Sequence, residues 1–427
     1  MLDAPRTLEK RLKIDFMGVA MITVIDSPCG FGKTQYMINM INENPTKNYI
    51  YITPYLNEVE RIKNNTKFLQ AKITRFVEPV YTKKKKKYDC LIDYIYDSKD
   101  IVSTHSLFSR CNKEIVDTIK QNKYTLILDE VMSVVKVLDI SYRDIKLILD
   151  KGIAELGYHN ELIWKVQDYS IIDRYGDIYD LCMNNHVYVY NNRALIWTFP
   201  IEIFSAFKDV YICTYMFDAQ IQKYYYDLYN VRYTKMSIVN NELVDYVEQK
   251  SNTDKIHILY NDKLNNIGED DFSLSKSWYK HNKDKLKFVK NRIYNFVRNI
   301  APIISKEKVS YKDILWTTYK DYKSNLSGKG YSKSFLPCNM RATNDYINTY
   351  VVAYMINVFL NPIILQFFKD RDVTINQDKY ALSEMIQFIY RSAIRNDVDI
   401  YVYIPSKRMR NLLEEYIGKQ IRYDMPF

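Results

Sequence analysis

Glycine and proline are scarce in this chain of 427 residues, which has 10 Gly and 11 Pro but 40 Tyr. This usage is typical of coding by an AT-rich genome, because Tyr, Asn, Lys and Ile have AT-rich codons and Gly and Pro do not. The scarcity makes the position of each glycine informative. Two of the ten, Gly30 and Gly32, lie within one stretch of four residues.

Paired cysteines and long apolar runs are also missing. The six cysteines include no Cys-x-x-Cys pair and the five histidines are dispersed, so no zinc site or disulfide framework can be predicted. The first twenty residues carry acids and bases rather than a signal-peptide core, and no run of about 18 apolar residues follows. We therefore expect a reduced, cytoplasmic protein that does not act in a membrane.

The length and the charge favour a protein of two domains that can bind a polyanion. Single hydrophobic cores stop growing at about 250–300 residues, and the chain is longer than that. The net charge of +10 permits nucleic acid as a partner. The densest basic run is Lys83–Lys87, between Tyr81 and Tyr88. This run either touches a phosphate backbone or forms a solvated loop, and the sequence leaves both readings open.

The octet Ser27–Thr34, Ser-Pro-Cys-Gly-Phe-Gly-Lys-Thr, follows the apolar run Val19–Ile25. A strand, a glycine loop and then Gly-Lys-Thr is the order in which chains build a nucleoside triphosphate site. The glycines let backbone N–H groups surround phosphate oxygens, and the positive end of the following helix faces the same charge. The candidate nucleotide-binding residues are Ser27, Gly30, Phe31, Gly32, Lys33 and Thr34, with Lys33 on the β and γ phosphates and the Thr34 hydroxyl on Mg²⁺.

A second motif ends the apolar stretch Tyr124–Val131 in two adjacent carboxylates, Asp129 and Glu130. Asp129 is a candidate Mg²⁺ ligand. Glu130 is a candidate for orienting or deprotonating the water that attacks the γ phosphate. Two acids at a strand end are common by chance, but their place after a phosphate loop in the same βαβ pattern favours a catalytic pair.

Three more segments contain a predicted strand end. Thr53–Ile62 turns from a strand to a helix at Pro54, and Asp100–Ser109 and Lys208–Phe217 are short strands that end in polar residues. Ligands gather at the carboxyl ends of strands in open α/β sheets, so Thr104 and His105 are candidate contacts, although a lone histidine there is more often structural. Thr214 is expected beside Glu130 if its strand neighbours the acidic one.

The rest of the chain shows a coarse pattern. Residues 140–205 are predicted to have mixed secondary structure that is mainly helical. The first domain is expected to end within 235–255. A second α/β pattern without its own phosphate loop follows. Its predicted elements are a basic helical stretch at 276–299, strands at 313–318 and 399–404, a strand and turn at 334–345, and helices at 346–360 and 384–395.

The segment Gln387–Arg395 supplies a candidate arginine pair. If it is helical, Arg391 and Arg395 are one turn apart and share a face. Arginines offered from a second domain can stabilise charge that develops on a γ phosphate. The alternative is a pair of surface arginines on an amphipathic helix.

Taken in order, these motifs resemble the series of superfamily 2 DEAD/DEAH-box-like helicases, and in particular a bacteriophage-encoded branch. The motifs are Ser27–Thr34, Thr53–Ile62, Thr104-His105, Asp129-Glu130, Cys213–Tyr215, Arg341–Asp345, Gln387–Arg395 and Tyr403–Arg410. The resemblance implies an α/β fold of two RecA-like parallel-sheet domains, 1–240 and 241–427, with ATP and Mg²⁺ in the cleft between them. It also implies that nucleic acid runs across both domains.

The resemblance assigns roles residue by residue. Lys33, Asp129, Glu130, Gln387, Arg391 and Arg395 are the implied catalytic residues, and Thr34 and Asp129 hold the metal. The implied nucleic-acid contacts are Thr53, Pro54, Thr104, His105, Thr343 and Asn344. The chain departs from the family where Tyr390 replaces the usual glycine and where the two arginines are four residues apart instead of three.

The resulting hypothesis is an ATP-dependent helicase or translocase, acting on DNA in phage or mobile-element replication or recombination, in the host cytoplasm. Two alternatives stay open. A P-loop nucleotide kinase needs the same glycine loop, and an ATP-gated nucleic-acid-binding switch needs ATP but no strand separation.

Overall fold

The computed structural model describes residues 21–66, 75–83, 85–184, 186–260, 262–265, 267, 270–338, 340, 345–418 and 423–424. These residues form two compact units. The first lies within Met1–Ser27, Phe31–Glu248 and Asn361–Ile375, and the second within Pro28–Gly30, Gln249–Leu360 and Asn376–Phe427. The sequence pattern did not predict that Asn361–Ile375 belongs with the first unit. The domain limits 1–240 and 241–427 stay a prediction.

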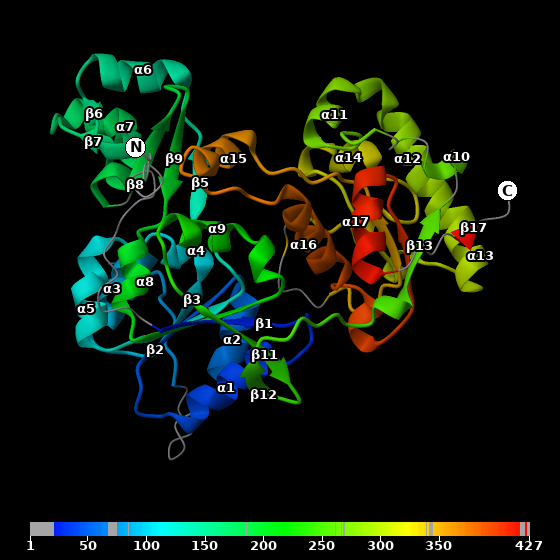
Figure 1. Ribbon diagram of the computed structural model, residues 1–427, viewed down its shortest axis with the longest axis horizontal. Helices are drawn as coiled ribbons and strands as arrows, with labels where there is room; N and C mark the ends of the chain where they lie inside the picture. Colours follow the sequence, from blue (N-terminus) through cyan, green and yellow to red (C-terminus); the bar gives the residue numbers. More distant parts are fainter. Residues whose placement is uncertain are drawn as a thin grey trace, which may run out of the picture. The chain divides into compact units, whose positions relative to one another are not determined.

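The first unit is built on a seven-stranded sheet (Figure 1). Its order is β12 (Glu242–Asp245), β11 (Thr234–Val239), β1 (Met21–Asp26), β10 (Asp209–Thr214), β4 (Thr125–Asp129), β2 (Tyr49–Thr53) and β3 (Ile101–Thr104). All neighbours are parallel except β11 and β12. Its helices include α1 (Lys33–Glu43), α2 (Leu56–Asn65), α3 (Lys87–Tyr96), α4 (His105–Phe108), α5 (Val116–Gln121), α8 (Ile201–Ala206) and α9 (Ile221–Leu228). The predicted α/β class with two parallel sheets is confirmed.

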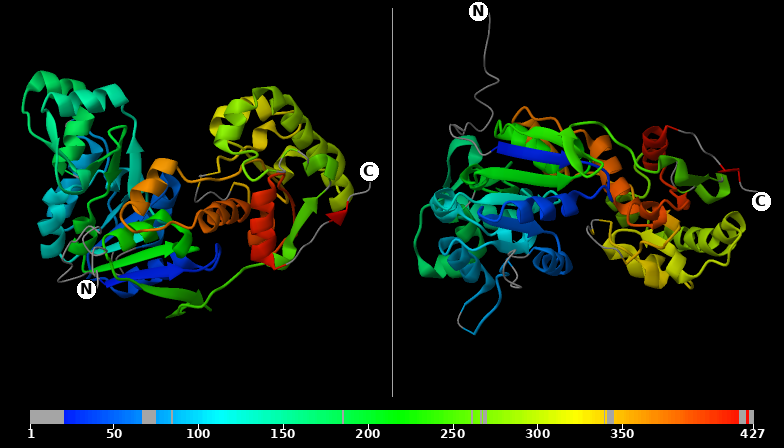
Figure 2. Two further views of the ribbon diagram at one scale, coloured as in Figure 1. Left: turned by 45° about the horizontal axis from the view of Figure 1, so that its top comes forward. Right: turned by 90° about the horizontal axis from the view of Figure 1, so that it is seen from below.

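Residues 135–198 form an insert that differs from the mainly helical prediction (Figures 1 and 2). It contains an antiparallel sheet, β5 (Val135–Leu138), β9 (Ala194–Thr198) and β8 (His186–Tyr190), a hairpin of β6 (Ala154–Leu156) and β7 (Leu162–Trp164), and the helices α6 (Tyr142–Asp150) and α7 (Tyr169–Asn184). The missed signal is turn chemistry. Asn191 and Asn192 both have positive φ, of 46° and 53°, which Asn adopts readily in hairpin turns.

Helix α15 (Pro362–Lys369) comes from late in the chain and packs against this insert, beside β5 in Figure 1. The Phe367 ring lies 5.5 Å from the Tyr188 ring. The buried Arg371 guanidinium donates to the His159 carbonyl at 2.9 Å and lies 5.0 Å from the Tyr188 ring. Apolar packing and a buried cation over aromatic rings therefore anchor this segment.

The half-buried His186 holds the insert to the rest of the first unit. Its Nδ1 lies 2.6 Å from Glu161 and its Nε2 lies 3.4 Å from Glu202. Burial lowers the pKa of His186, but the hydrogen bonds to the two carboxylates outweigh that effect and raise it above its ordinary value of 6.5. The same contacts outweigh burial at Glu202 and lower its pKa to about 2.

We expect the thermal stability of the chain to fall as the pH rises above 6.5, the ordinary pKa of histidine, because the raised pKa of His186 adds stability only while the ring is protonated. The low pKa of Glu202 adds stability that is constant in this window. Differential scanning calorimetry of His186→Gln should show a smaller pH dependence than the wild type. The exposed His281→Gln is the control, and an unchanged slope in His186→Gln would contradict the assignment.

The second unit is built on a five-stranded parallel sheet. Its order is β14 (Ile314–Thr317), β15 (Val351–Tyr354), β16 (Ile400–Tyr403), β13 (Ile256–Tyr260) and β17 (Tyr423–Asp424). Its helices include α10 (Asp262–Asn265), α11 (Lys276–His281), α12 (Leu286–Asn295), α13 (Ala301–Ser305), α14 (Lys323–Leu326), α16 (Gln377–Ile389) and α17 (Lys407–Ile417).

Two predictions for this unit were wrong. The helix predicted at 346–360 is the strand β15, because Val351–Tyr354 is a fully buried run in the middle of a parallel sheet, where a strand loses its alternating pattern. The strand predicted to begin at 334 is a 3₁₀ turn with a single bridge from Phe335 to Trp316.

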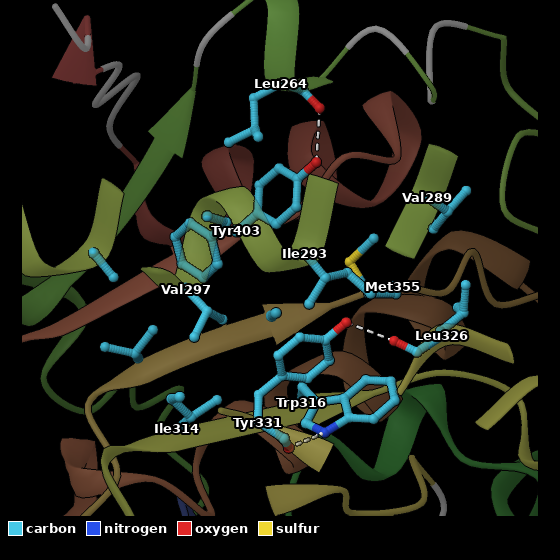
Figure 3. Close-up of a cluster of buried hydrophobic side chains, with 14 of the residues drawn as sticks. Leu264, Val289, Ile293, Val297, Ile314, Trp316, Leu326, Tyr331, Met355 and Tyr403 are labelled. Carbon is cyan, nitrogen blue, oxygen red and sulfur yellow. Dashed lines mark hydrogen bonds between the residues drawn. The ribbon is translucent and has the colours of Figure 1, made fainter. Parts of the chain in front are cut away.

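A buried aromatic cluster fills the space between this sheet and its helices (Figure 3). The indole N–H of Trp316 donates to the Tyr331 carbonyl at 2.8 Å, and the Tyr331 hydroxyl donates to the Leu326 carbonyl at 2.6 Å. The Tyr403 hydroxyl donates to the Leu264 carbonyl at 2.7 Å. Each polar tip thus has an acceptor, which lets these large side chains be buried without an unsatisfied donor.

Candidate nucleotide-binding site

The phosphate loop leaves β1 at Ser27 and enters α1 at Lys33. Gly30 and Gly32 have φ of 90° and 78°, a region that side chains with a Cβ rarely adopt. Ser27 is fully buried, and its hydroxyl accepts the Ile238 N–H at 2.8 Å. The Ser27 hydroxyl therefore ties the loop to β11, while Gly30, Phe31 and Gly32 retain partial or full exposure.

The two side chains that open α1 face the candidate chemistry. Lys33 is buried, and its ammonium donates to the Ser27 carbonyl at 2.5 Å, inside the loop. The Thr34 hydroxyl lies 3.3 and 3.4 Å from the two carboxylate oxygens of Asp129. Residues 95 positions apart are thus brought together at one edge of the sheet.

The carboxylate of Asp129, at the end of β4, is held in an unfavourable electrostatic environment. Burial, with contributions from Glu130 and Glu58, raises the pKa of Asp129 to about 7, against the opposing effects of Lys33 and Thr34. Glu130 has φ of 79°, which is unusual for a residue with a long side chain. Its N–H donates to the Cys213 carbonyl at 2.8 Å. The Thr214 hydroxyl lies 3.4 Å from Glu130, as the strand assignment predicted.

These residues fit a hydrated magnesium ion. The Thr34 hydroxyl and the Asp129 carboxylate are hard oxygen donors beside excess negative charge. In the described part of the chain, no three His, Cys, Asp or Glu side chains gather as a metal cluster. Mg²⁺ does not require one, because it takes one or two protein oxygens and completes its shell with water and phosphate oxygens.

Two acidic residues of this edge were missed by sequence reasoning. The buried Asp26, at the end of β1, accepts the Met216 N–H at 2.7 Å and the Phe217 N–H at 2.9 Å. Glu58, in the first turn of α2, is 8% exposed and adds negative charge near Asp129. The available signal for Asp26 was its place between the strand and the loop, but one acid at a strand end is too common to single out.

Four of the six predicted nucleic-acid residues lie at the carboxyl ends of β2 and β3, where Thr53 and Thr104 are register partners. The Thr53 side chain is fully buried, and its hydroxyl has no hydrogen-bond partner among the described residues. Pro54, Thr104 and His105 are partly exposed. Thr343 and Asn344 lie outside the described residues.

A groove of about 990 Å³ begins directly after His105. The insert forms one wall, with Lys136, Asp177 and Trp197, and the segments before and after β3 form the other, with Lys86, Ser106 and Arg110 among the lining residues. Asp139 and Asp180 also line it. Lys136 lies over the Trp197 ring at 5.7 Å, and the buried Trp197 N–H has no partner among the described residues.

The candidate arginine segment differs from the single helix that was predicted. Helix α16 ends at Ile389, and Ala393–Asn396 is a separate 3₁₀ turn. The Ser392 hydroxyl donates to the Ile389 carbonyl at 2.6 Å, and the Ala393 N–H turns away to the Thr349 carbonyl at 2.8 Å. Arg391 and Arg395 therefore do not share one helix face.

The burial of this segment is informative. Arg391 is 2% exposed and Arg395 is partly exposed. Gln387 is 5% exposed, and neither atom of its side-chain amide has a hydrogen-bond partner among the described residues. An amide buried without partners is costly, and such groups cluster at functional sites.

The fold and the site define a class: an α/β protein of two RecA-like parallel-sheet units, with a phosphate loop after β1 and an acidic strand end at β4. The solved structure of S. tokodaii Xpd4 matches with a TM-score of 0.51 and 13% identity, over 95% of this chain and 96% of that one. At this identity the likeness concerns the fold alone. The solved structure of the DUF1998 helicase MrfA bound to DNA matches with a TM-score of 0.34 and 10% identity, over 94% of this chain and 46% of that one. A match at this TM-score supports no conclusion about this chain.

The chain belongs to the family of the SPbeta prophage-derived protein YonV of Bacillus subtilis (strain 168). The two sequences are 41% identical over 418 residues, which is 93% of this chain and 99% of the relative. Residues 250–417 match the family model of the YonV C-terminal Rossmann-like domain. That match spans most of the second unit. Every helix in the described part of the chain is too short or too polar to span a membrane.

Replacement of Asp26 should destabilise the first unit. Asp26→Ala leaves the buried Phe217 N–H without an acceptor, which costs about 1–3 kcal/mol, and it also removes the acceptor of the partly buried Met216 N–H. Asp26→Asn keeps one acceptor oxygen and should lose less. Urea unfolding followed by circular dichroism measures the loss. The more exposed Asp218→Ala is the control, and wild-type stability of Asp26→Ala would refute the role of this carboxylate.

Proposed function

We propose that this protein is an ATP-dependent helicase or translocase. The observation that carries the proposal is the convergence of Lys33 and Thr34 with Asp129 and Glu130 at the carboxyl edge of one parallel sheet, with the Thr34 hydroxyl 3.3 Å from Asp129. This is the set of groups that holds a nucleoside triphosphate and activates water for phosphoryl transfer. A nucleotide kinase would share the loop, but the strand-end pair Asp129-Glu130 and the second RecA-like unit favour a motor.

In this proposal each residue has a defined role. Backbone N–H groups around Ser27, Gly30, Phe31 and Gly32 bind phosphate oxygens, and Lys33 leaves the Ser27 carbonyl to contact the β and γ phosphates. Thr34 and Asp129 hold Mg²⁺, which neutralises phosphate charge when bound. Glu130 accepts the proton of the attacking water, and the Thr214 hydroxyl beside it fixes the orientation of the carboxylate.

The second unit supplies Gln387, Arg391 and Arg395 to the nucleotide in this proposal. The buried amide of Gln387, with neither atom hydrogen-bonded among the described residues, supports a contact made only when a ligand or a partner surface is present. Arginine charge then offsets the charge that develops on the γ phosphate. We assign the finger to Arg391, which lies two residues after the end of α16 at Ile389 and close to Gln387 in the chain.

Nucleic acid is proposed to run over the exposed strand ends of the first unit, at Pro54, Thr104 and His105, with Thr53 beneath them and Thr343 and Asn344 from the second half of the chain. The groove lined by Ser106 extends this track; its lining has three basic side chains, Lys86, Arg110 and Lys136, and three acidic ones, so the phosphates are proposed to contact the basic side chains alone. We propose DNA as the polymer and phage or mobile-element replication or recombination as the setting. The relation to a prophage-derived protein supports the phage-encoded branch and hence the host cytoplasm.

The central test is ATP hydrolysis by the wild type and Lys33→Ala, each without polymer and with single-stranded DNA, duplex DNA or RNA. We expect single-stranded DNA to stimulate hydrolysis. We expect Lys33→Ala to lower the stimulated rate by about 10²–10³-fold, the usual cost of removing one preorganised donor to transition-state charge. Strand displacement from a forked duplex then distinguishes a helicase from a translocase.

Other outcomes would redirect the assignment. Hydrolysis that no polymer stimulates would contradict a nucleic-acid motor and favour a kinase or a switch. Stimulation by RNA alone would overturn the choice of DNA. Tight ATP binding without turnover would favour the ATP-gated switch.

The proposed contact of nucleic acid with the groove can be tested separately. The double variant Lys86→Glu with Arg110→Glu should weaken binding to single-stranded DNA. It should also lower the slope of log affinity against log salt by about one for each lost phosphate contact. Fluorescence anisotropy at several salt concentrations measures both. The control is Lys99→Glu with Lys120→Glu, two exposed lysines of the same unit that do not line the groove. An equal effect in both double variants would contradict a specific track.

A further inference from the structure

The second unit presents one phenylalanine in an unusual way. The Phe272 side chain is 67% exposed, and its ring stacks on Phe359 with a centroid distance of 5.6 Å and an interplanar angle of 23°. A single exposed apolar side chain needs no explanation in itself. Phe272 differs from such a side chain because its ring is held flat against a second ring while most of it stays exposed to solvent.

The turn that carries Phe272 is fixed by a buried amide. Asn357 is fully buried, and its side-chain N–H groups donate to the Asp271 carbonyl at 2.7 Å and the Ser273 carbonyl at 3.0 Å. Its backbone N–H donates to the Leu274 carbonyl at 2.9 Å. Three hydrogen bonds from one residue therefore hold the turn against the segment that leaves β15.

Arg408, in the first turn of α17, supports the Phe359 side of the stacked pair. Its guanidinium donates to the Asn357 side-chain oxygen and to the Val358 carbonyl, both at 2.9 Å, and lies 4.3 Å from the Phe359 ring centroid. Asp378 accepts from the same guanidinium at 2.7 Å. Phe272, Phe359, Asn357 and Arg408 together form what we call the Phe272 platform.

The platform lies where parallel sheets bind ligands. Phe359 follows the carboxyl end of β15, and Arg408 follows the carboxyl end of β16, the neighbouring strand. The carboxyl ends of parallel strands are the usual ligand-binding edge in open α/β sheets. The rigid ring is thus offered at the functional edge of the second unit.

The charge that follows the platform in the chain is strongly positive. The segment 276–298 has eight lysines and arginines against one aspartate, whereas the net charge of the whole chain is only +10. Five of its lysines are exposed on α11, on α12 and between them: Lys276, Lys280, Lys283, Lys285 and Lys287. The nearby Asp270 is engaged within the turn, where it accepts the Phe272 N–H at 2.8 Å and the Ser273 hydroxyl at 2.7 Å.

We propose that the Phe272 platform stacks an unpaired base of single-stranded nucleic acid whose phosphate backbone lies along the lysines of α11 and α12. The inference rests on the proposed function and deepens it, because it selects a single strand as the form of polymer bound by this unit. A nucleotide presents the flat face of its base to the ring and a phosphate of opposite charge to the lysines. Stacking is worth about 1–3 kcal/mol per base. In a duplex the base faces are already covered by their neighbours.

The test compares Phe272→Leu with Phe272→Tyr in the full chain without ATP, using fluorescence of an oligonucleotide that contains 2-aminopurine. Leu keeps an apolar side chain but cannot stack, whereas Tyr keeps the ring. We expect Phe272→Leu to bind the single strand about tenfold more weakly with an unchanged salt slope, and Phe272→Tyr to bind like the wild type. Phe288→Leu is the matched control, an exposed ring on α12 among the same lysines.

The outcomes separate the platform from the proposed function. Wild-type affinity and wild-type quenching of 2-aminopurine in Phe272→Leu would overturn the platform while leaving the helicase proposal intact. Equal losses in Phe272→Leu and Phe288→Leu would also overturn it, because they would indicate general contact with the helical surface. A wild-type protein that binds no single strand would refute the proposed function itself. Unchanged ATP hydrolysis without polymer in Phe272→Leu shows that the variant is folded.

Discussion

The parallel pairing of β1, β10 and β4 is the constraint on which the candidate site depends. The register sets Asp26 opposite Thr214 and Cys213 opposite Asp129. Because parallel strands end at the same edge, the phosphate loop, the Thr214 turn and the acidic pair meet there. Asp26 fastens this edge by accepting two N–H groups from the chain that leaves β10. A shift of one residue in either pairing would separate Thr34 from Asp129 and reverse the sides of the acidic side chains.

The same edge concentrates charge that the folded chain does not neutralise by itself. Glu58 is paired with Arg61 at 3.1 Å, whereas Asp129 and Glu130 lie near one buried ammonium, that of Lys33. Burial, with the charges of Glu130 and Glu58, raises the pKa of Asp129. A site arranged for folding alone would give Asp129 and Glu130 cationic partners of their own or remove them, because buried charges without such partners are costly. The arrangement is consistent with a site completed by a divalent cation and a polyanionic ligand, since the cation stabilises the carboxylates and the lysine stabilises the phosphates.

The sequence predicted the parts of the fold whose signals are local. Strong strands that end in turns, such as Tyr49–Thr53 and Thr125–Asp129, are recognisable from their apolar runs, and the glycine loop from its spacing. The β15 strand was missed because a fully buried run has the same composition as a buried helix. The insert was missed because its hairpin depends on two asparagines with positive φ. The docking of Asn361–Ile375 on the first unit depends on contacts between residues far apart in sequence, such as Phe367 with Tyr188, which no local pattern records.

In the candidate site, too, some residues could be predicted from the sequence and others could not. Lys33, Thr34, Asp129 and Glu130 could be named because their chemistry is carried by short motifs, whereas Asp26 and Glu58 acquire their roles only through folding. The platform shows the limit most clearly, because with 40 tyrosines and 18 phenylalanines no aromatic residue stands out in the sequence. What singles out Phe272 is the buried Asn357, which joins the turn before α11 to the exit of β15, and Arg408, which reaches both from α17. A rigid exposed ring requires such support, since a loosely held side chain would lose its rotamer freedom on stacking and part of the binding energy with it.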